Sequence, residues 1–302
     1  MIRLEEVSKS LGGKTIIDRV SFTVPQGEIV GLLGPNGAGK TTIVRLIQGV
    51  ISQDGGSISV DGKDARLQGN AIRQMSGVVT ESAGLYPDMT AEENLRFFAR
   101  IYGVEKERER IGSLLRQVGL TEAKDRRIGG YSTGMKKRLA IAKALLHRPR
   151  LLFLDEPTNG LDPDGIREIL TYLEQMNREE GTTTILCSHV LHQLENVCDS
   201  YLFLEQGRII EQGNLAELEG KYAASVVLHV ETGATSNDAR LPSAYRPRAV
   251  GDGRLELTLP GRDQIPELLR LLLSYTWVHS VQIVNRSLES IYFEVRRTYN
   301  EQ

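Results

Sequence analysis

The stretch of sequence that decides the fold is Gly34-Pro35-Asn36-Gly37-Ala38-Gly39-Lys40-Thr41-Thr42. It matches the pattern G-x-x-x-x-G-K-[ST], in which glycines let backbone N–H groups turn inward around phosphate oxygens. The apolar run from Ile29 to Leu33 predicts a buried strand before it, and apolar residues at helical spacing predict an amphipathic helix from about Lys40. A strand, a glycine-rich loop and a helix in this order predict a phosphate-binding loop at a helix N-terminus.

Every residue of this loop is a candidate contact for a nucleoside triphosphate: Gly34, Pro35, Asn36, Gly37, Ala38, Gly39, Lys40, Thr41 and Thr42. The Lys40 side chain can reach the β- and γ-phosphates, and the Thr41 hydroxyl can bind Mg²⁺. The alternative is a glycine turn that binds no ligand, and the strand and helix on either side of the loop argue against it.

A second element, Leu151-Leu152-Phe153-Leu154-Asp155-Glu156, ends an apolar run with two carboxylates. In a parallel sheet this end of the strand should emerge beside the phosphate loop. We expect Asp155 to hold Mg²⁺ through water and Glu156 to polarise the attacking water as a general base. Alone, an acidic pair after a strand is more often a polar turn, and only the phosphate loop favours the catalytic interpretation.

The composition is that of an ordinary soluble globular protein. The chain has 302 residues, of which 40% are hydrophobic and 25% charged, and this excludes a disordered or fibrous class. With 37 Lys and Arg against 39 Asp and Glu, the net charge is -2, so no basic excess favours a nucleic-acid partner. The two cysteines, Cys187 and Cys198, lack metal-site spacing and are expected to be small buried thiols in a reducing cytosol.

The apolar runs of the sequence are too short for a membrane span, which needs about 18 residues. The N-terminal residues also lack the apolar core of a signal peptide. We therefore expect a cytoplasmic protein.

Two domains are expected because glycine is unevenly distributed. Residues 1–220 contain 26 of the 30 glycines and residues 221–302 contain 4, which predicts a boundary near Gly220. Before it, strands alternate with helices, and this favours a mostly parallel sheet covered on both sides. The expected strands are a meander over 1–34 and runs at 151–154 and 182–187, and the expected helices are 91–102, 108–118, 134–146 and 162–180. After the boundary we expect a small α+β unit with strands at 226–230, 254–259 and 278–284 and helices at 266–275 and 287–296.

Further motifs follow in a fixed order. Tyr131-Ser132-Thr133-Gly134-Met135 precedes a basic helix, Asp155 to Asp162 follows about twenty residues later, and Ser188-His189 ends another apolar run. With the phosphate loop, this order and spacing resembles the nucleotide-binding subunit of ATP-binding cassette (ABC) transporters over about residues 1–220. The resemblance implies an α/β fold of the P-loop NTPase class, ABC type, with a mixed sheet core and a helical subdomain at about 85–150.

The resemblance also implies an assembly. In that family two cassettes dimerise head to tail and bury two ATP, each with Mg²⁺, between the phosphate loop of one and the signature of the other. It makes Ser132 and Gly134 the signature contacts to the opposing γ-phosphate. It places Asp162 in the loop that crosses the dimer interface, and His189 at the γ-phosphate and the attacking water.

The sequence departs from the family pattern in three features. The signature is usually L-S-G-G-Q, and here it keeps only Ser132 and the second glycine, Gly134. Glu81 replaces a glutamine that contacts Mg²⁺, and a glutamate can still be a metal ligand although it adds charge beside the phosphates. Leu11 replaces the aromatic residue that stacks on adenine, so we expect weaker discrimination between bases.

Two short segments resemble subunits that serve small, separate exporter permeases: Gly84 to Leu95, and Ser287 to Glu294 near the C-terminus. The resemblance therefore implies an ATPase that powers export through a permease encoded as another chain. Its other partner is a second ATP-binding subunit, identical or paralogous. Such a subunit is peripheral on the inner face of the cell membrane, and its cargo is not encoded here.

The alternative is a non-transport cassette acting on DNA or ribosomes. Cassettes that repair DNA insert a long coiled coil between phosphate loop and signature, but Lys40 and Ser132 are only 92 residues apart, with no heptads between them. Ribosome-acting relatives usually carry two cassettes, and this sequence has one phosphate loop. We therefore expect no nucleic-acid partner. Intact Asp155, Glu156 and His189 argue against a purely regulatory ATP-binding module.

Overall fold

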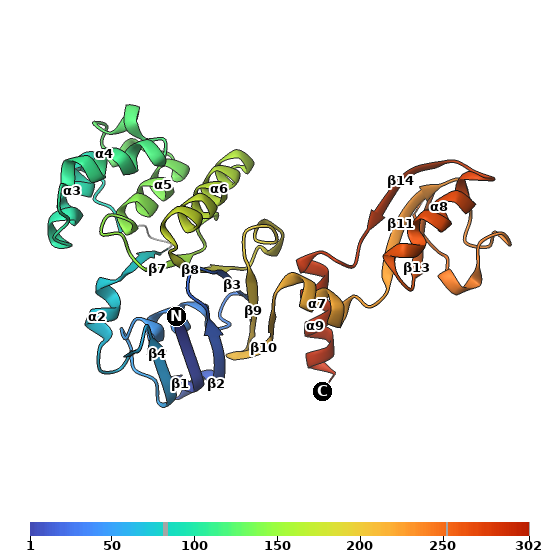
Figure 1. The fold of residues 1–302 in the computed structure, drawn as a ribbon, viewed down its shortest axis with the longest axis horizontal. Helices are drawn as coiled ribbons and strands as arrows, with labels where there is room; N and C mark the ends of the chain where they lie inside the picture. The colour runs from blue at the N-terminus through green and yellow to red at the C-terminus, as the bar shows by residue number, and fades with distance from the viewer. Residues whose placement is uncertain (81–83, 252, 302) are drawn as a thin grey trace. The chain divides into compact units, whose positions relative to one another are not determined.

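The computed structural model describes residues 1–80, 84–251 and 253–301, and the chain divides into two units, Met1–Gln212 and Gly213–Gln302 (Figure 1). The predicted boundary at Gly220 is wrong, because it falls inside helix α7 (Leu215–Tyr222), which belongs to the second unit. Asn214 and Glu217 form a capping box that starts this helix, and Glu219 forms an ion pair of 2.8 Å with Arg286 of the same unit. Glycine content could not detect this boundary, because α7 itself contains Gly220.

Two sheets form the first unit. The antiparallel sheet has the strand order β2-β1-β4-β5, with Ile2 of β1 opposite both Val24 and Val60. Its strands are β1 (Ile2–Leu11), β2 (Lys14–Val24), β4 (Gly55–Val60) and β5 (Lys63–Asp64). Alternating apolar residues direct one face of β1 and β2 into the core. The predicted meander over 1–34 is confirmed for these two antiparallel strands and wrong for the run from Ile29 to Leu33, which joins the other sheet.

The second sheet carries the loops of interest and has the order β10-β9-β3-β8-β7-β6. Its strands are β3 (Ile29–Leu33), β6 (Ser76–Val79), β7 (Leu151–Asp155), β8 (Thr183–Ser188), β9 (Ser200–Glu205) and β10 (Arg208–Gly213). β3 pairs in parallel with both β8 and β9, and β7 pairs in parallel with β8 and β6. Every residue of β3 and β8 is buried, as is typical of parallel strands covered on both faces.

Helices of the first unit are α1 (Lys40–Ile47), α2 (Gly69–Gln74), α3 (Ala91–Ile101), α4 (Glu107–Gln117), α5 (Thr133–Ala144) and α6 (Pro163–Glu180). The four long helices predicted from periodicity are confirmed to within two residues at each end. α3, α4 and α5 pack on one another and form the helical subdomain (Figure 1). Thr90 and Glu93 start α3 with a capping box. Short 3₁₀ turns lie at Thr121–Ala123, Ile128–Gly130, Leu191–Gln193, Ser243–Tyr245 and Arg262–Gln264.

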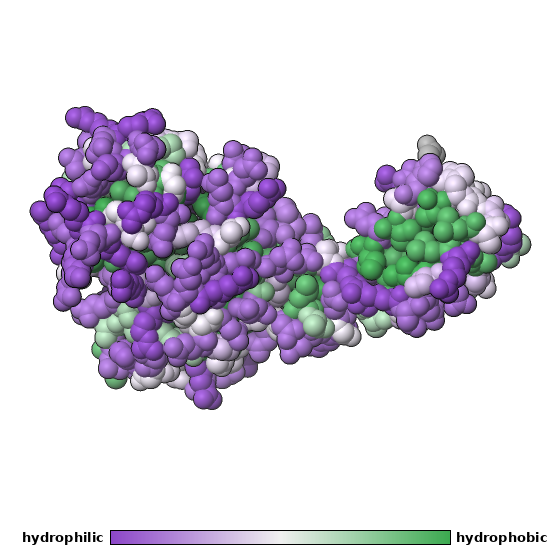
Figure 2. All heavy atoms as spheres, turned by 45° about the horizontal axis from the view of Figure 1, so that its top comes forward, coloured by the Kyte–Doolittle hydropathy of each residue, from purple (hydrophilic) through white to green (hydrophobic). Residues whose placement is uncertain are grey.

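The second unit is the α+β unit that its pattern predicted. Its elements are α7, β11 (Val226–Thr232), β12 (Arg248–Gly251), β13 (Arg254–Leu259), α8 (Ile265–Leu273), β14 (Val278–Ile283) and α9 (Leu288–Asn300). The strands form an antiparallel sheet of order β12-β13-β11-β14, and Leu268 and Leu272 of α8 complete the core on its buried face. Figure 2 shows a broad hydrophobic area on this unit, which exposes Leu273 and Trp277.

No helix among the described residues is long and apolar enough to cross a bilayer. Cys187 and Cys198 are free thiols, and burial raises the pKa of both. The expected burial is confirmed for Cys187, whereas Cys198 is of intermediate exposure.

The turn between β9 and β10 contacts the phosphate loop. Gly207 has a φ of +81°, its N–H donates to the carbonyl of Ala38 over 3.0 Å, and its carbonyl accepts the N–H of Asp18 over 2.9 Å. A Cβ at this position would lie 2.2 Å from the carbonyl oxygen of Ile16. The turn can approach both segments this closely only because residue 207 has no side chain.

We expect Gly207→Ala to lower the free energy of unfolding by about 3 kcal/mol or more, because the new Cβ collides with main-chain atoms. Gly13→Ala is the matched control, since Gly13 has a similar φ of +79° and open space around it. Backbone strain alone should cost the control about 1 kcal/mol. Urea unfolding followed by circular dichroism compares the two, and equal losses would contradict the close approach.

Candidate functional site

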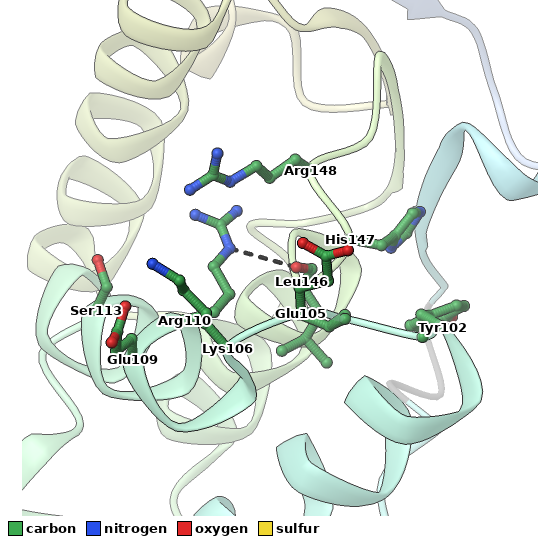
Figure 3. A pocket seen from close by; sticks show the side chains of 11 residues that line it. Tyr102, Glu105, Lys106, Glu109, Arg110, Ser113, Leu146, His147 and Arg148 are labelled. Atoms are coloured by element: carbon green, nitrogen blue, oxygen red, sulfur yellow. Dashed lines mark hydrogen bonds between the residues drawn. The ribbon is translucent and has the colours of Figure 1, made fainter.

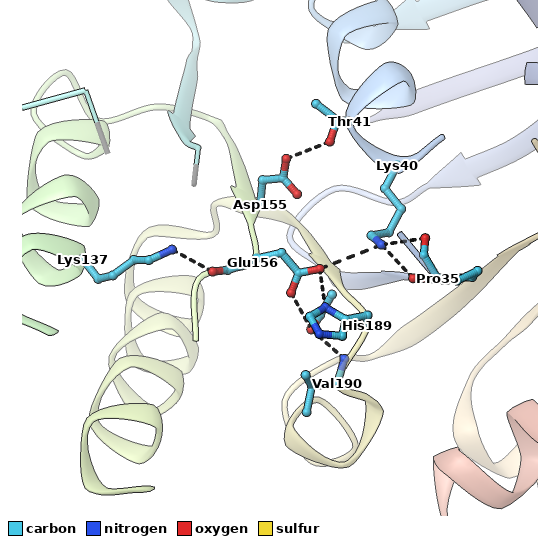
Figure 4. A network of polar contacts seen from close by, with 10 residues as sticks. Pro35, Lys40, Thr41, Lys137, Asp155, Glu156, His189 and Val190 are labelled. Atoms are coloured by element: carbon cyan, nitrogen blue, oxygen red, sulfur yellow. Dashed lines mark hydrogen bonds and ion pairs between the residues drawn. The ribbon is translucent and has the colours of Figure 1, made fainter. Parts of the chain in front are cut away.

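The phosphate loop connects β3 to α1, and its lysine lies against the loop. Lys40 is the first residue of α1 and is buried, and its Nζ donates to the carbonyls of Gly34 (2.7 Å) and Pro35 (3.2 Å). The same ammonium lies 3.9 Å from Oε1 of Glu156 (Figure 4). The Lys40 ammonium therefore lies between the phosphate loop and the acidic end of β7.

Thr41 and Asp155 meet although they come from distant parts of the sequence. The Thr41 hydroxyl donates to Oδ2 of Asp155 over 2.9 Å. Hydroxyl and carboxylate oxygens are donors that Mg²⁺ prefers, so this pair fits the ion. No cluster of three or more His, Cys, Asp or Glu side chains exists within the described residues that could hold a metal alone. A cation here would take its other ligands from phosphate oxygens and water.

Glu156 is held by two residues that follow β8. Its Oε1 accepts Nδ1–H of His189 over 2.8 Å, and its Oε2 accepts the Ser188 hydroxyl over 3.3 Å (Figure 4). The Glu156 side chain is largely buried, whereas the His189 ring is more exposed. A largely buried carboxylate with a hydrogen-bonded imidazole can accept a proton from water.

A cavity of about 360 Å³ lies over the loop. It is lined by Leu11, Ile16, Asn36, Gly37, Gly39, Lys40, Thr41, Thr42, Asp155 and Glu156. The lining combines the ammonium of Lys40 and the carboxylates of Asp155 and Glu156 with the apolar side chains of Leu11 and Ile16. The arrangement suits a ligand with a phosphate end and an apolar end.

The predicted signature residues gather at a second cavity, of about 460 Å³. Ser132 caps α5 by accepting the N–H of Met135, and Asp162 caps α6 by accepting the N–H of Gly165. Gly134 lines the same cavity. Among the described residues, this cavity and the one over the phosphate loop have no lining residue in common.

The comparisons with known proteins concern the family and the fold. The family model described as ABC transporter matches residues 17–159. Two uncharacterized ABC transporter ATP-binding proteins of Bacillus subtilis (strain 168) match almost end to end: YdbJ at 32% identity (100% of this chain, 97% of YdbJ) and YhcH at 36% (98% and 95%). A solved ATP-binding subunit of an ABC transporter is 31% identical, with a TM-score of 0.68 over 74% of this chain and 93% of its own.

The chain belongs to the ABC transporter ATP-binding family. It is an ATPase subunit of the ABC type and binds ATP, and the predicted P-loop NTPase fold of this type is confirmed. A dimeric cassette solved with ADP and Pi shares the fold at 24% identity, with a TM-score of 0.65 over 71% of this chain and 98% of its own.

In this ABC subunit the structure brings some predicted site residues together and separates others. Lys40 and His189 both contact Glu156, Thr41 contacts the adjacent Asp155, and Leu11 lines the cavity over the phosphate loop. Ser132, Gly134 and Asp162 lie at the other cavity. Glu81 is outside the described residues.

Sequence reasoning assigned no role to two residues that contact Glu156. Ser188 belongs to the Ser188-His189 motif, and its position immediately before His189 is the signal that could have identified it as a contact of Glu156. Lys137, whose Nζ donates to the main-chain carbonyl of Glu156 over 2.8 Å, gave no such signal, because it is one of several basic residues in its helix.

A larger cavity of the ABC subunit, about 620 Å³, lies in the helical subdomain (Figure 3). Its central Arg110 donates to the carbonyls of Leu145 and Leu146, at the end of α5, and forms an ion pair of 3.7 Å with Glu180. Burial lowers the pKa of this guanidinium. The contacts give Arg110 a packing role, since it caps the C-terminal end of α5.

Leu11→Tyr tests the expected base contact. An aromatic ring at this position, 45% exposed at the end of β1, should stack on adenine and add about 1 kcal/mol. We expect the Kd for ATP, measured by isothermal titration calorimetry, to fall about fivefold and the preference for ATP over GTP to rise. Leu11→Ile, which adds no ring, is the control, and equal affinities for the Tyr and Ile variants would exclude Leu11 from the base site.

Proposed function

We propose that this chain is an ATP-hydrolysing subunit that dimerises around two ATP and powers export through a separate membrane permease. The observation that carries the proposal is the Glu156 carboxylate, held by His189 and Ser188 within 3.9 Å of the Lys40 ammonium. This places a candidate base beside a candidate phosphate-binding cation.

The phosphate loop binds the triphosphate in this proposal. Its backbone N–H groups and the N-terminus of α1 face the phosphate oxygens, and Lys40 exchanges its carbonyl partners for the β- and γ-phosphates. Thr41 and Asp155 would hold Mg²⁺, which would supply positive charge to neutralise developing charge on the phosphates. Leu11 and Ile16, two apolar side chains that line the cavity, receive the base.

Hydrolysis then needs an activated water in line with the β–γ bond. Glu156 accepts a proton from this water as its oxygen bonds to the γ-phosphorus, and the bond to ADP breaks. His189 orients the carboxylate and contacts the γ-phosphate. Because both carboxylate oxygens of Glu156 already have partners, its rotamer is set before the substrate arrives.

The second half of each ATP site comes from another subunit. Ser132, Gly134 and Asp162 line a cavity apart from that of Lys40, so one copy of the chain would not surround the γ-phosphate. We propose that a second ATP-binding subunit, identical or paralogous, supplies them. ATP binding then closes the dimer and hydrolysis reopens it.

An exposed aromatic cluster suits the permease contact. The Tyr86 ring lies 5.1 Å from that of Phe97 and 5.9 Å from that of Phe98. Asn94, fully buried, bonds both main-chain groups of Tyr86 and fixes the segment before α3. We propose that a cytoplasmic segment of the permease docks on these rings and holds the subunit at the inner face of the membrane.

The names of two relatives support a transport function, and one of the two names export. The bacitracin transport protein BcrA of Bacillus licheniformis is 38% identical over 70% of this chain and 69% of its own length. The Nod factor export protein I of Rhizobium sp. (strain N33) is 39% identical over 82% of this chain and 80% of its own. The cargo of this subunit's permease is a separate question, because the permease forms the path.

Glu156→Gln should lower kcat for ATP about a thousandfold while ATP still binds, because the amide cannot accept the proton. An ATP-bound dimer should accumulate, which light scattering after gel filtration detects. Glu122→Gln, at an exposed turn, is the control and should hydrolyse ATP normally. Turnover by Glu156→Gln within tenfold of the wild type would remove Glu156 as the base.

Phe97→Asp tests the docking surface, since Phe97 is 38% exposed. We expect its ATP hydrolysis to stay within twofold of the wild type, whereas an integral membrane protein should no longer copurify from detergent-extracted membranes. Phe293→Asp, at a 59% exposed phenylalanine of the second unit, should retain that protein. Recovery of ribosomes or DNA in place of a membrane protein would contradict the transport function.

A further inference from the structure

Lys137 lies in the helix that starts at the signature, and its ammonium reaches the end of β7. The residue is only 6% exposed, and its Nζ donates to the main-chain carbonyl of Glu156 over 2.8 Å (Figure 4). Burying an ammonium is unfavourable unless it is paired, so this contact strongly constrains both groups. The bond joins the helical subdomain to the proposed catalytic residue.

The main chain at Glu156 has an unusual conformation. Its φ is +51°, in the left-handed region that residues with side chains rarely adopt. Its N–H donates to the carbonyl of Cys187 over 3.0 Å, while its carbonyl also accepts the N–H of Asn159 over 3.3 Å. Surrounding contacts must hold such a conformation, and it determines where the carboxylate points.

Helix α5 is held along its length and can act as a rigid link. Ser132 caps its start, Arg138 forms an ion pair of 2.9 Å with Glu168 of α6, and Arg110 bonds the carbonyls at its end. Ser132 and Lys137 are five positions apart, which is roughly 7 Å along a helix. A shift of the Ser132 end therefore displaces the Lys137 ammonium as well.

We propose that Lys137 is a positioning residue that couples the signature end of α5 to the general base of the same subunit. Nucleotide contacted by Ser132 belongs to the opposing site, whereas Glu156 acts at the subunit's own site. Through Lys137, occupancy of one site sets the geometry of the base in the other. The inference rests on the proposed role of Glu156.

Lys137→Met tests this role, because methionine has similar length but no N–H donor. We expect kcat for ATP to fall about tenfold to a hundredfold, while KM, the Kd for ATP and the melting temperature stay close to wild type. Lys137→Arg keeps a donor and should recover most of the lost kcat, and Lys137→Gln, a shorter donor, should be intermediate. Lys124→Met is the matched control at a surface ion pair and should leave kcat unchanged.

A purely structural role gives a different result. If Lys137→Met and Lys137→Gln both lose ATP binding or melt at a lower temperature in step with kcat, Lys137 only supports the fold and the proposal is overturned. An unchanged kcat in Lys137→Met overturns it too. Failure of Lys137→Arg to recover activity removes the hydrogen bond as the cause.

The coupling to the signature is tested with Ser132→Ala. If both residues act on one path, the double variant with Lys137→Met should lower kcat no further than the more severe single change. Effects that multiply would show that Lys137 acts without the signature and overturn the coupling. The Glu156→Gln variant distinguishes failure of this inference from failure of the proposed function. If Glu156→Gln retains turnover, the proposed function fails. If Glu156→Gln abolishes turnover but Lys137→Met does not lower it, only this inference fails.

Discussion

Parallel pairing of β3 with β8, and of β8 with β7, is the constraint on which the rest of the structure depends. Parallel strands end at one edge of a sheet, so the phosphate loop after β3, the Ser188–His189 turn after β8 and the carboxylates after β7 emerge side by side. β8 separates the other two strands and delivers the two side chains that hold Glu156. The site is thus a consequence of strand order, and it would be lost if β7 and β8 exchanged places.

At this edge of the sheet, a series of polar contacts extends from the phosphate loop to the helical subdomain. Asp155 contacts Thr41, Glu156 contacts His189, and Lys137 reaches the main chain of Glu156 from α5. The helical subdomain therefore touches the candidate catalytic residue directly. A fold that holds a base through a helix from a second subdomain can respond to what binds at that helix.

Much of the fold and of the candidate site could be predicted from the sequence, because the sequence signals for them are local. Helix α6 has a proline at its start, an aspartate cap and apolar residues every three or four positions, and its ends were predicted closely. Local signals failed at the boundary between the units, because glycine content does not distinguish Gly213, where the second unit begins, from Gly220 inside α7. They also missed β9 and β10, because a short apolar run does not reveal its pairing partner. The role of Lys137 could not be predicted for the same reason, because its partner Glu156 lies nineteen positions away, across a contact between subdomains.

By itself the sequence determined the identity and order of the chemical groups: a phosphate loop, two carboxylates after a strand, a signature and a histidine. These are local patterns, because adjacent residues determine the backbone conformation that each of them needs. Only the tertiary structure decided which of them meet. It brought Lys40, Asp155 and Glu156 to one cavity, with His189 bonded to Glu156, and put Ser132, Gly134 and Asp162 at another. Strand pairing and helix packing join these segments, which lie far apart in the chain.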